Sequence, residues 1–175
     1  MKLLNADNPI LLFALLMASL LGLQACGDNS TGVQPPPDFS TVPAAYDTSE
    51  AVSKVTQDNG LIIYTISESD SPLAGVVARD AVRIYYTGRK TDGEIFASSY
   101  ANGNTSPAQF SNLFPQSSSL IEGFREGLMG MREGEKRTIV IPPSLGYGES
   151  RPGTNGFDLR NDTLVYDVLL DEILN

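Results

Sequence analysis

Apolar residues in the second part of the chain follow the short patterns that are typical of β-strands. Residues 61–66 (LIIYTI) are rich in β-branched and aromatic side chains and run into a turn-rich segment, so they predict a strand that ends there. In residues 82–86 (VRIYY) one face is apolar and the other is more polar, as expected for a half-buried strand. Residues 138–141 (TIVI) and 163–170 (TLVYDVLL) predict two further strands.

A turn and one helix connect these strands. The Asp92-Gly93 pair is a strong turn signal and would lead the strand at 82–86 back into residues 95–96 as a hairpin. Residues 122–129 place apolar side chains four positions apart, which predicts one short helix that covers a face of the sheet. Because the strands lack the helical crossovers of parallel sheets, the pattern predicts an α+β domain with an antiparallel sheet.

Residues 1–25 have the layout of a bacterial secretory signal. Residues 10–23 form an uncharged apolar run, shorter than the ~20 residues that a membrane-spanning helix needs. Ala25 directly precedes Cys26, which resembles a lipoprotein signal whose cysteine is acylated, for example with palmitate, and becomes the new N-terminus. We therefore expect an exported, membrane-anchored protein whose domain lies in the periplasm or on the cell envelope. An uncleaved anchor and an ordinary secretory signal with an incidental cysteine stay open as alternatives.

The segment after the signal is predicted to be a tether. Residues 26–50 are rich in Pro, Ser, Thr, Asp and Gly and show no apolar periodicity. Three consecutive prolines at 35–37 would stiffen it locally toward an extended conformation. A proline-rich recognition peptide is the alternative for this stretch. The globular domain would then cover residues 51–175.

Composition narrows the possible functions. Twelve Lys and Arg against 21 Asp and Glu give a formal net charge of -9, which repels phosphate backbones, so no nucleic-acid partner is expected. Zero His and one Cys exclude Ser–His and Cys–His nucleophile pairs and zinc sites that need clustered imidazoles or thiolates. A carboxylate-only metal or glycosidase site stays open on these grounds. A chain of 175 residues leaves little room for a separate cofactor domain, and no cofactor is expected.

Aromatic residues recur between the predicted elements, and most of them are suited to a small hydrophobic core. Tyr147 differs, because it stands between Gly146 and Gly148 in a loop of Pro, Ser and Gly, where burial is usually poor. Its hydroxyl would be available to donate a hydrogen bond to a bound molecule.

Three segments, in this order, resemble the FKBP-type peptidyl-prolyl cis-trans isomerases. They are YYTGRKTDGEIFASSY (85–100), LIEGFREGLMGMREGEKRTIVIPPSLGYGE (120–149) and TLVYDVLL (163–170), and the resemblance extends from about residue 60 to the end. It implies a bent antiparallel sheet of about five strands wrapped over one short helix. Between them it implies an aromatic pocket that accepts a proline ring and needs no metal or cofactor.

The resemblance also implies residue roles. The catalytic positions would be Tyr86, Phe96, Ile121 and Tyr147, and the substrate-binding positions Phe110, Leu120, Phe124 and Tyr166. The backbone N–H of Ile121 and the hydroxyl of Tyr147 would each donate a hydrogen bond to a carbonyl of the bound peptide. The expected partners are polypeptides with accessible X-Pro bonds, macrolide-type inhibitors, and the lipid bilayer through Cys26.

Several positions depart from the family pattern. Ala97 stands where the family usually has an Asp beside the Tyr86 hydroxyl, and Phe124 stands where it most often has Trp. Residues 153–163 lack the usual apolar Ile-Pro-Pro segment, and the loop at 111–120 is longer than usual. The main hypothesis is an isomerase of exported proteins. Because Ala97 supplies no carboxylate, the alternative is a proline-peptide binding or holdase module with low turnover. A third possibility is an acidic structural lipoprotein without a pocket.

Overall fold

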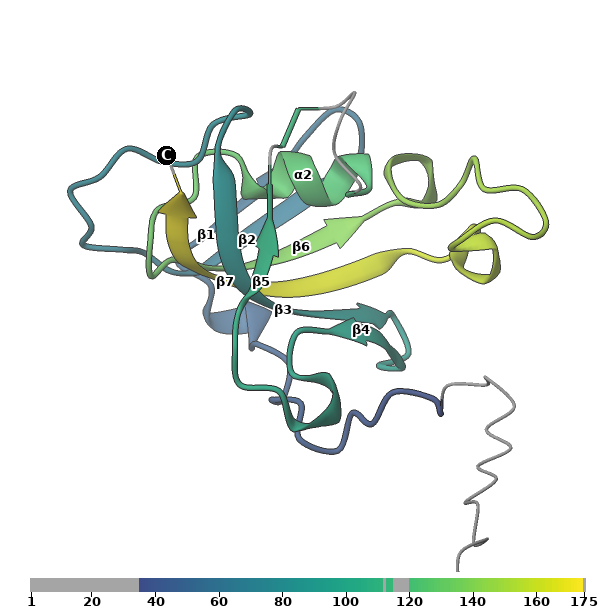
Figure 1. Ribbon diagram of the computed structural model, residues 1–175. Helices are drawn as coiled ribbons and strands as arrows, with labels where there is room; N and C mark the ends of the chain where they lie inside the picture. The colour runs from purple at the N-terminus through teal and green to yellow at the C-terminus, as the bar shows by residue number, and fades with distance from the viewer. Residues whose placement is uncertain (1–34, 112, 115–119, 175) are drawn as a thin grey trace, which may run out of the picture. The chain divides into compact units, whose positions relative to one another are not determined.

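An antiparallel sheet forms the framework of the domain, and one helix lies across one of its faces (Figure 1). The computed structural model describes residues 35–111, 113–114 and 120–174. Within these residues the sheet has 7 strands in the order β1-β2-β6-β7-β3-β4, and β5 pairs with β3 as well. The strands are β1 (Ser53–Thr56), β2 (Ile62–Ser67), β3 (Ala81–Lys90), β4 (Ile95–Ser98), β5 (Ala108–Phe110), β6 (Lys136–Ile141) and β7 (Leu164–Leu174).

The predicted α+β class and antiparallel pairing are confirmed, and the described residues contain the one α-helix expected for the domain. The helix is α2 (Glu122–Leu128), and the hairpin between β3 and β4 turns at Gly93, whose φ is +93°. Four short 3-10 helices complete the elements: η1 (Thr48–Glu50), η2 (Ala101–Gly103), η3 (Pro143–Leu145) and η4 (Phe157–Leu159). Strands β1 and β5 were not predicted, because all four residues of β1 are exposed and β5 is only three residues long, so neither carries an apolar alternation.

Two of the inward-facing residues of α2 are glycines, and the helix packs so closely on the sheet that a side chain at either position would clash. A Cβ at Gly127 would lie 2.5 Å from the Ile139 side chain on β6, and one at Gly123 would lie 2.5 Å from the Ile141 side chain. Phe124 and Leu128 fill the remaining inner face of α2 and are buried. The core under the helix consists mainly of aliphatic residues from β3, β6, β7 and the residue before β2: Leu61, Val82, Ile84, Ile139, Ile141, Leu164, Val168 and Leu170.

Part of the predicted tether packs against the domain. The compact unit begins at Pro37, before the expected boundary at residue 51. We call residues 38–46 the N-terminal strap; they lie on the side of the sheet away from α2 (Figure 1). Many contacts of the strap are made by its backbone; the Pro43 carbonyl, for example, accepts a hydrogen bond from Arg89 at 2.7 Å. Such contacts do not require an apolar side-chain pattern, so the sequence shows no periodicity here.

The predicted signal segment and Cys26 lie outside the described residues. Among the residues that are described, no helix has both the length and the apolar character to cross a bilayer.

Candidate functional site

A cavity of about 120 Å³ opens between α2 and the inner face of the sheet. Among the described residues, its lining has no charged side chain and combines rings, aliphatic groups and three tyrosine hydroxyls. The lining residues are Tyr86, Ala97, Phe110, Leu120, Ile121, Phe124, Tyr147 and Tyr166. All predicted pocket residues except Phe96 therefore meet at one site, although they come from β3, β5, β7, α2 and two loops.

The rings of the cavity form one connected cluster. The Phe124 ring centroid lies 4.4 Å from that of Tyr166 and 5.9 Å from that of Tyr86. Phe110 continues the cluster, with its centroid 6.0 Å from Tyr86. These separations are those of attractive, offset or tilted aromatic pairs. The cluster fixes the position of each ring by contact with the next.

Phe96 supports the cavity from behind. Its ring meets Tyr166 edge-on, with the centroids 5.5 Å apart. The close approach depends on Gly88 of β3, because a Cβ there would lie 2.7 Å from Phe96 and 2.8 Å from the Tyr166 ring. Sequence reasoning missed Gly88, although it faces the same side of β3 as Tyr86, two positions earlier in the strand.

Backbone geometry leaves a donor free at the edge of the cavity. Ile121 is the N-cap of α2, and its carbonyl accepts a hydrogen bond from the Arg125 N–H at 3.1 Å. Within the described part of the chain, the N–H of Ile121 has no acceptor of its own. The first N–H groups of a helix lack intrahelical partners, so this donor is available to a ligand.

The three hydroxyls remain neutral over a wide pH range. Burial raises the pKa of Tyr86, and the neighbouring Tyr147 raises it further. Burial also raises the pKa of Tyr147, although hydrogen bonding with the Tyr166 hydroxyl partly opposes this. Tyr166 is the most deeply buried of the three, and its pKa is raised most strongly, again mainly by burial. Neutral hydroxyls can donate hydrogen bonds, whereas tyrosinates cannot.

The position of Ala97 has a direct consequence for Tyr86. Ala97 lines the cavity with a methyl group and supplies no acceptor. Among the described residues, no side chain or backbone group forms a hydrogen bond with the Tyr86 hydroxyl. The carboxylate that is missing from the family pattern is therefore not replaced by another described polar group.

The atypical loop at 153–163 shapes the site indirectly. Neither Phe157 nor Leu159 lines the cavity: the Phe157 ring packs against the Arg160 guanidinium, and Leu159 packs against the core. Gly156, with φ of +78°, lies directly against the Tyr147 ring, because a Cβ there would approach it to 2.1 Å. The loop thus backs the half-buried Tyr147 instead of supplying a rim to the cavity.

Comparison with known proteins places this chain in a family. Residues 74–171 match the family model described as FKBP-type peptidyl-prolyl cis-trans isomerase. The chain belongs to this family. The FKBP-type fold and the resemblance inferred from the three sequence segments are thereby confirmed, while the individual roles of the pocket residues stay predictions.

Relatives of this FKBP-type domain include bacterial and animal proteins. It is 42% identical over 96 residues to bovine peptidyl-prolyl cis-trans isomerase FKBP10, a match that covers 55% of this chain and 15% of the relative. A probable FKBP-type isomerase of Haemophilus influenzae is 36% identical over 115 residues, covering 66% of this chain and 43% of the relative. The crystal structure of FkpA from Escherichia coli has 29% identity and a TM-score of 0.57, covering 72% of this chain and 54% of that one. The chain thus spans well under two thirds of the length of these relatives.

The uncharged lining of the FKBP-type pocket predicts how catalytic activity depends on pH. We expect kcat/KM for an uncharged X-Pro peptide to be constant from about pH 5 to 9, because no lining group titrates there and the tyrosine pKa values lie above their ordinary ~10. Activity should fall only at higher pH, as the hydroxyls lose their protons. A pH series with one peptide tests this. A titration with a midpoint below pH 7 would show that a carboxylate takes part in the reaction.

Proposed function

We propose that the domain accelerates cis–trans isomerisation of X-Pro bonds without forming a covalent intermediate. The observation that carries this proposal is the uncharged, ring-lined cavity, together with the Ile121 N–H at its edge, which has no acceptor among the described residues. Its volume of about 120 Å³ is roughly four times the ~30 Å³ share of one water molecule in the liquid, which suits a small ring such as that of proline.

The reaction requires only a favourable environment for the twisted amide. Rotation about a peptide C–N bond meets a barrier of ~18–20 kcal/mol, because resonance gives the bond double-bond character. The planar form is charge-separated, so an apolar cavity solvates it less well than water does. Directed donors can then favour the twisted form, and each ~1.4 kcal/mol of such preference accelerates the reaction tenfold. No nucleophile or general base is needed.

The residues of the cavity suggest how a peptide is held. The proline ring would stack within the cluster of Tyr86, Phe124 and Tyr166, while the Ile121 N–H and the Tyr147 hydroxyl donate to carbonyls on either side of the bond. Loss of one donor should lower transition-state stabilisation, and loss of a ring should weaken binding of proline. Any macrolide-type inhibitor that presents a proline-like ring would compete for the same space.

A protease-coupled assay on an X-Pro peptide tests the proposal. We expect turnover above the uncatalysed rate, with Tyr147→Phe lowering kcat/KM and Phe96→Ala lowering it further because Tyr166 loses its support. Turnover at the background rate with the peptide still bound would favour the binding or holdase module. If both substitutions changed stability alone, the pocket would have no role in function, as expected for a structural lipoprotein.

The Ala97→Asp substitution tests whether the absence of a carboxylate at this position limits turnover. An aspartate at this position would lie beside the unpaired Tyr86 hydroxyl and accept its hydrogen bond. Charge-assisted bonds contribute ~1.5–3 kcal/mol, so we expect kcat/KM to rise by about tenfold or more. Ala97→Asn is the control of similar size without the charge. Equal turnover in the wild-type and Ala97→Asp chains would contradict the idea that the missing carboxylate limits the rate.

We further propose that the chain is an exported lipoprotein that acts on X-Pro bonds of proteins folding outside the cytoplasm. The apolar run at 10–23 and the Ala25-Cys26 pair support this placement. Incorporation of labelled palmitate that disappears in Cys26→Ser is the expected result, and equal labelling of both chains would contradict it.

A further inference from the structure

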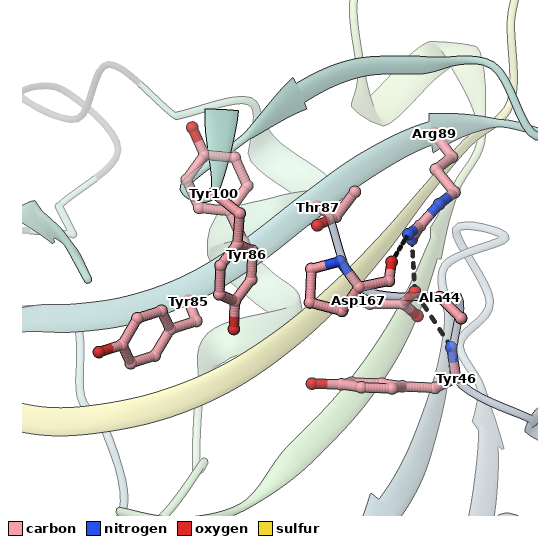
Figure 2. Close-up of a pocket in the computed structure, with 9 residues that line it drawn as sticks. Ala44, Tyr46, Tyr85, Tyr86, Thr87, Arg89, Tyr100 and Asp167 are labelled. Carbon is pink, nitrogen blue, oxygen red and sulfur yellow. Dashed lines mark hydrogen bonds and ion pairs between the residues drawn. The ribbon is translucent and has the colours of Figure 1, made fainter. Parts of the chain in front are cut away.

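The N-terminal strap covers a buried ion pair on the outer face of the sheet. A guanidinium nitrogen of Arg89 on β3 lies 2.6 Å from a carboxylate oxygen of Asp167 on β7, and the two side chains are only 10% and 7% exposed. Figure 2 shows the two charged groups pointing toward one another next to Ala44 and Tyr46 of the strap. Between strap and sheet, a cavity of only about 20 Å³ remains, so the two surfaces pack closely.

Strap and ion pair are joined by hydrogen bonds. The Arg89 guanidinium donates to the Pro43 carbonyl at 2.7 Å, and the Tyr46 N–H donates to the Asp167 carboxylate at 3.2 Å. The other oxygen of that carboxylate accepts from the Thr138 hydroxyl of β6 at 2.7 Å. Burial of Tyr46 against the sheet raises the pKa of its phenol to about 12. The strap therefore adds one hydrogen bond to each of the two charged groups, which also pair with one another.

The same two strands carry pocket residues on their opposite face. In β3 and β7 successive side chains alternate between the two faces of the sheet, so Arg89 and Asp167 point outward where Tyr86 and Tyr166 point into the pocket. Asp167 directly follows Tyr166, and Arg89 follows Gly88, which is paired with Tyr166 in the register of the two strands. A shift of β3 against β7 would move the pocket rings.

A second attachment of the strap leads to the backbone of Tyr86. At its start, the Asp38 N–H donates to the Asn102 side chain at 2.9 Å, and the Asp38 carbonyl accepts from the Asn102 N–H at 2.7 Å. The Thr41 hydroxyl donates to the Tyr100 carbonyl at 3.3 Å. The neighbouring Ser99 in turn fixes Tyr86, whose N–H donates to the serine hydroxyl at 3.0 Å and whose carbonyl accepts from the serine N–H at 2.9 Å.

We infer that the N-terminal strap is a positioning element of the pocket, which holds Tyr86 and Tyr166 in place from behind the sheet through the Arg89–Asp167 pair and the segment at 98–102. This inference rests on the proposed function for its kinetic consequence. Its residues do not touch the substrate, and they act through the strands that do. The segment between the lipid-proximal N-terminus and the domain would then be part of the catalytic unit, and not only a spacer.

The test replaces residues 38–46 of the full chain with a Gly/Ser sequence of equal length. The control carries the same replacement at residues 27–34, before the strap begins. We expect the strap variant to unfold cooperatively in urea. Its KM for a Phe-Pro peptide should rise about three- to tenfold, while kcat stays within about twofold of the wild-type value. A change of this size fits small shifts of the pocket rings, since a displacement near 1 Å can cost up to a hundredfold in rate. The control should match the wild-type chain. A strap variant that is less stable but has an unchanged KM would overturn the inference.

A milder variant decides the matter if the replacement does not fold. Thr41→Val combined with Asn102→Gly removes the side-chain bonds of the second attachment and leaves the ion pair intact; glycine suits position 102, where φ is +58°. It should also raise KM, and an unchanged KM would overturn the inference.

If the wild-type chain shows no turnover, the proposed function fails, and the Kd of the same peptide from an NMR titration replaces KM. A Kd that is equal in wild-type and strap variants would then refute the positioning role.

Discussion

Replacing Gly88 with alanine is expected to lower kcat/KM for an X-Pro peptide at least about tenfold, because misplacement by ~1 Å can cost up to a hundredfold. The new Cβ would stand 2.7 Å from Phe96 and 2.8 Å from Tyr166, so both rings must move. The backbone at this position does not have a positive φ, so the substitution acts by crowding and not by backbone strain. The destabilisation should be that of an overpacked site, about 1–3 kcal/mol. Steady-state kinetics and urea unfolding of the same preparation measure both effects.

Gly127→Ala provides a matched control. Its Cβ would crowd the Ile139 side chain at 2.5 Å, slightly closer than the 2.7 Å contact at Gly88, but Ile139 does not line the pocket. We expect a loss of stability similar in kind and a nearly unchanged kcat/KM. If Gly88→Ala kept full activity, or if Gly127→Ala lost as much activity, the packing of Tyr166 against Phe96 would not control the reaction.

Asp167→Ala is expected to cause the largest loss of stability. It would leave the Arg89 guanidinium buried without its counter-charge and remove the acceptor of Thr138 and of the Tyr46 N–H. Breaking a buried pair by removing one partner costs about 3–5 kcal/mol, because an uncompensated charge stays out of water. Urea unfolding measures the loss. Arg89→Met combined with Asp167→Leu should recover part of it, since no isolated charge then remains.

Glu172→Ala is the control on the same two strands. The Arg83–Glu172 pair also joins β3 to β7, but its side chains are 43% and 46% exposed. Exposed pairs contribute only ~0–1 kcal/mol, so this substitution should change stability little. Equal effects of Asp167→Ala and Glu172→Ala would show that burial under the strap does not make the inner pair important.

Much of the sheet was predictable because its strands carry apolar residues in regular patterns. Strand β7 is an example, with Leu164, Tyr166 and Val168 buried on one face. The strap was not predictable in this way, since its contacts join backbone groups to distant side chains such as Arg89 and leave no periodic signal. The pocket residues lie far apart in sequence, so only the family resemblance, and not periodicity, brought them together. The crowding at Gly88 depends on ring positions that no local pattern encodes.

The central claim is that the pocket itself speeds rotation about an X-Pro bond. Exchange NMR on a Phe-Pro peptide observes the cis and trans forms directly and needs no protease. Free X-Pro bonds exchange in tens to hundreds of seconds, so we expect catalytic amounts of the chain to produce cis–trans exchange peaks that the peptide alone does not show. These peaks should weaken in Gly88→Ala and persist in Gly127→Ala. Peptide signals that shift on binding while the cis–trans exchange rate stays at its uncatalysed value would contradict the account.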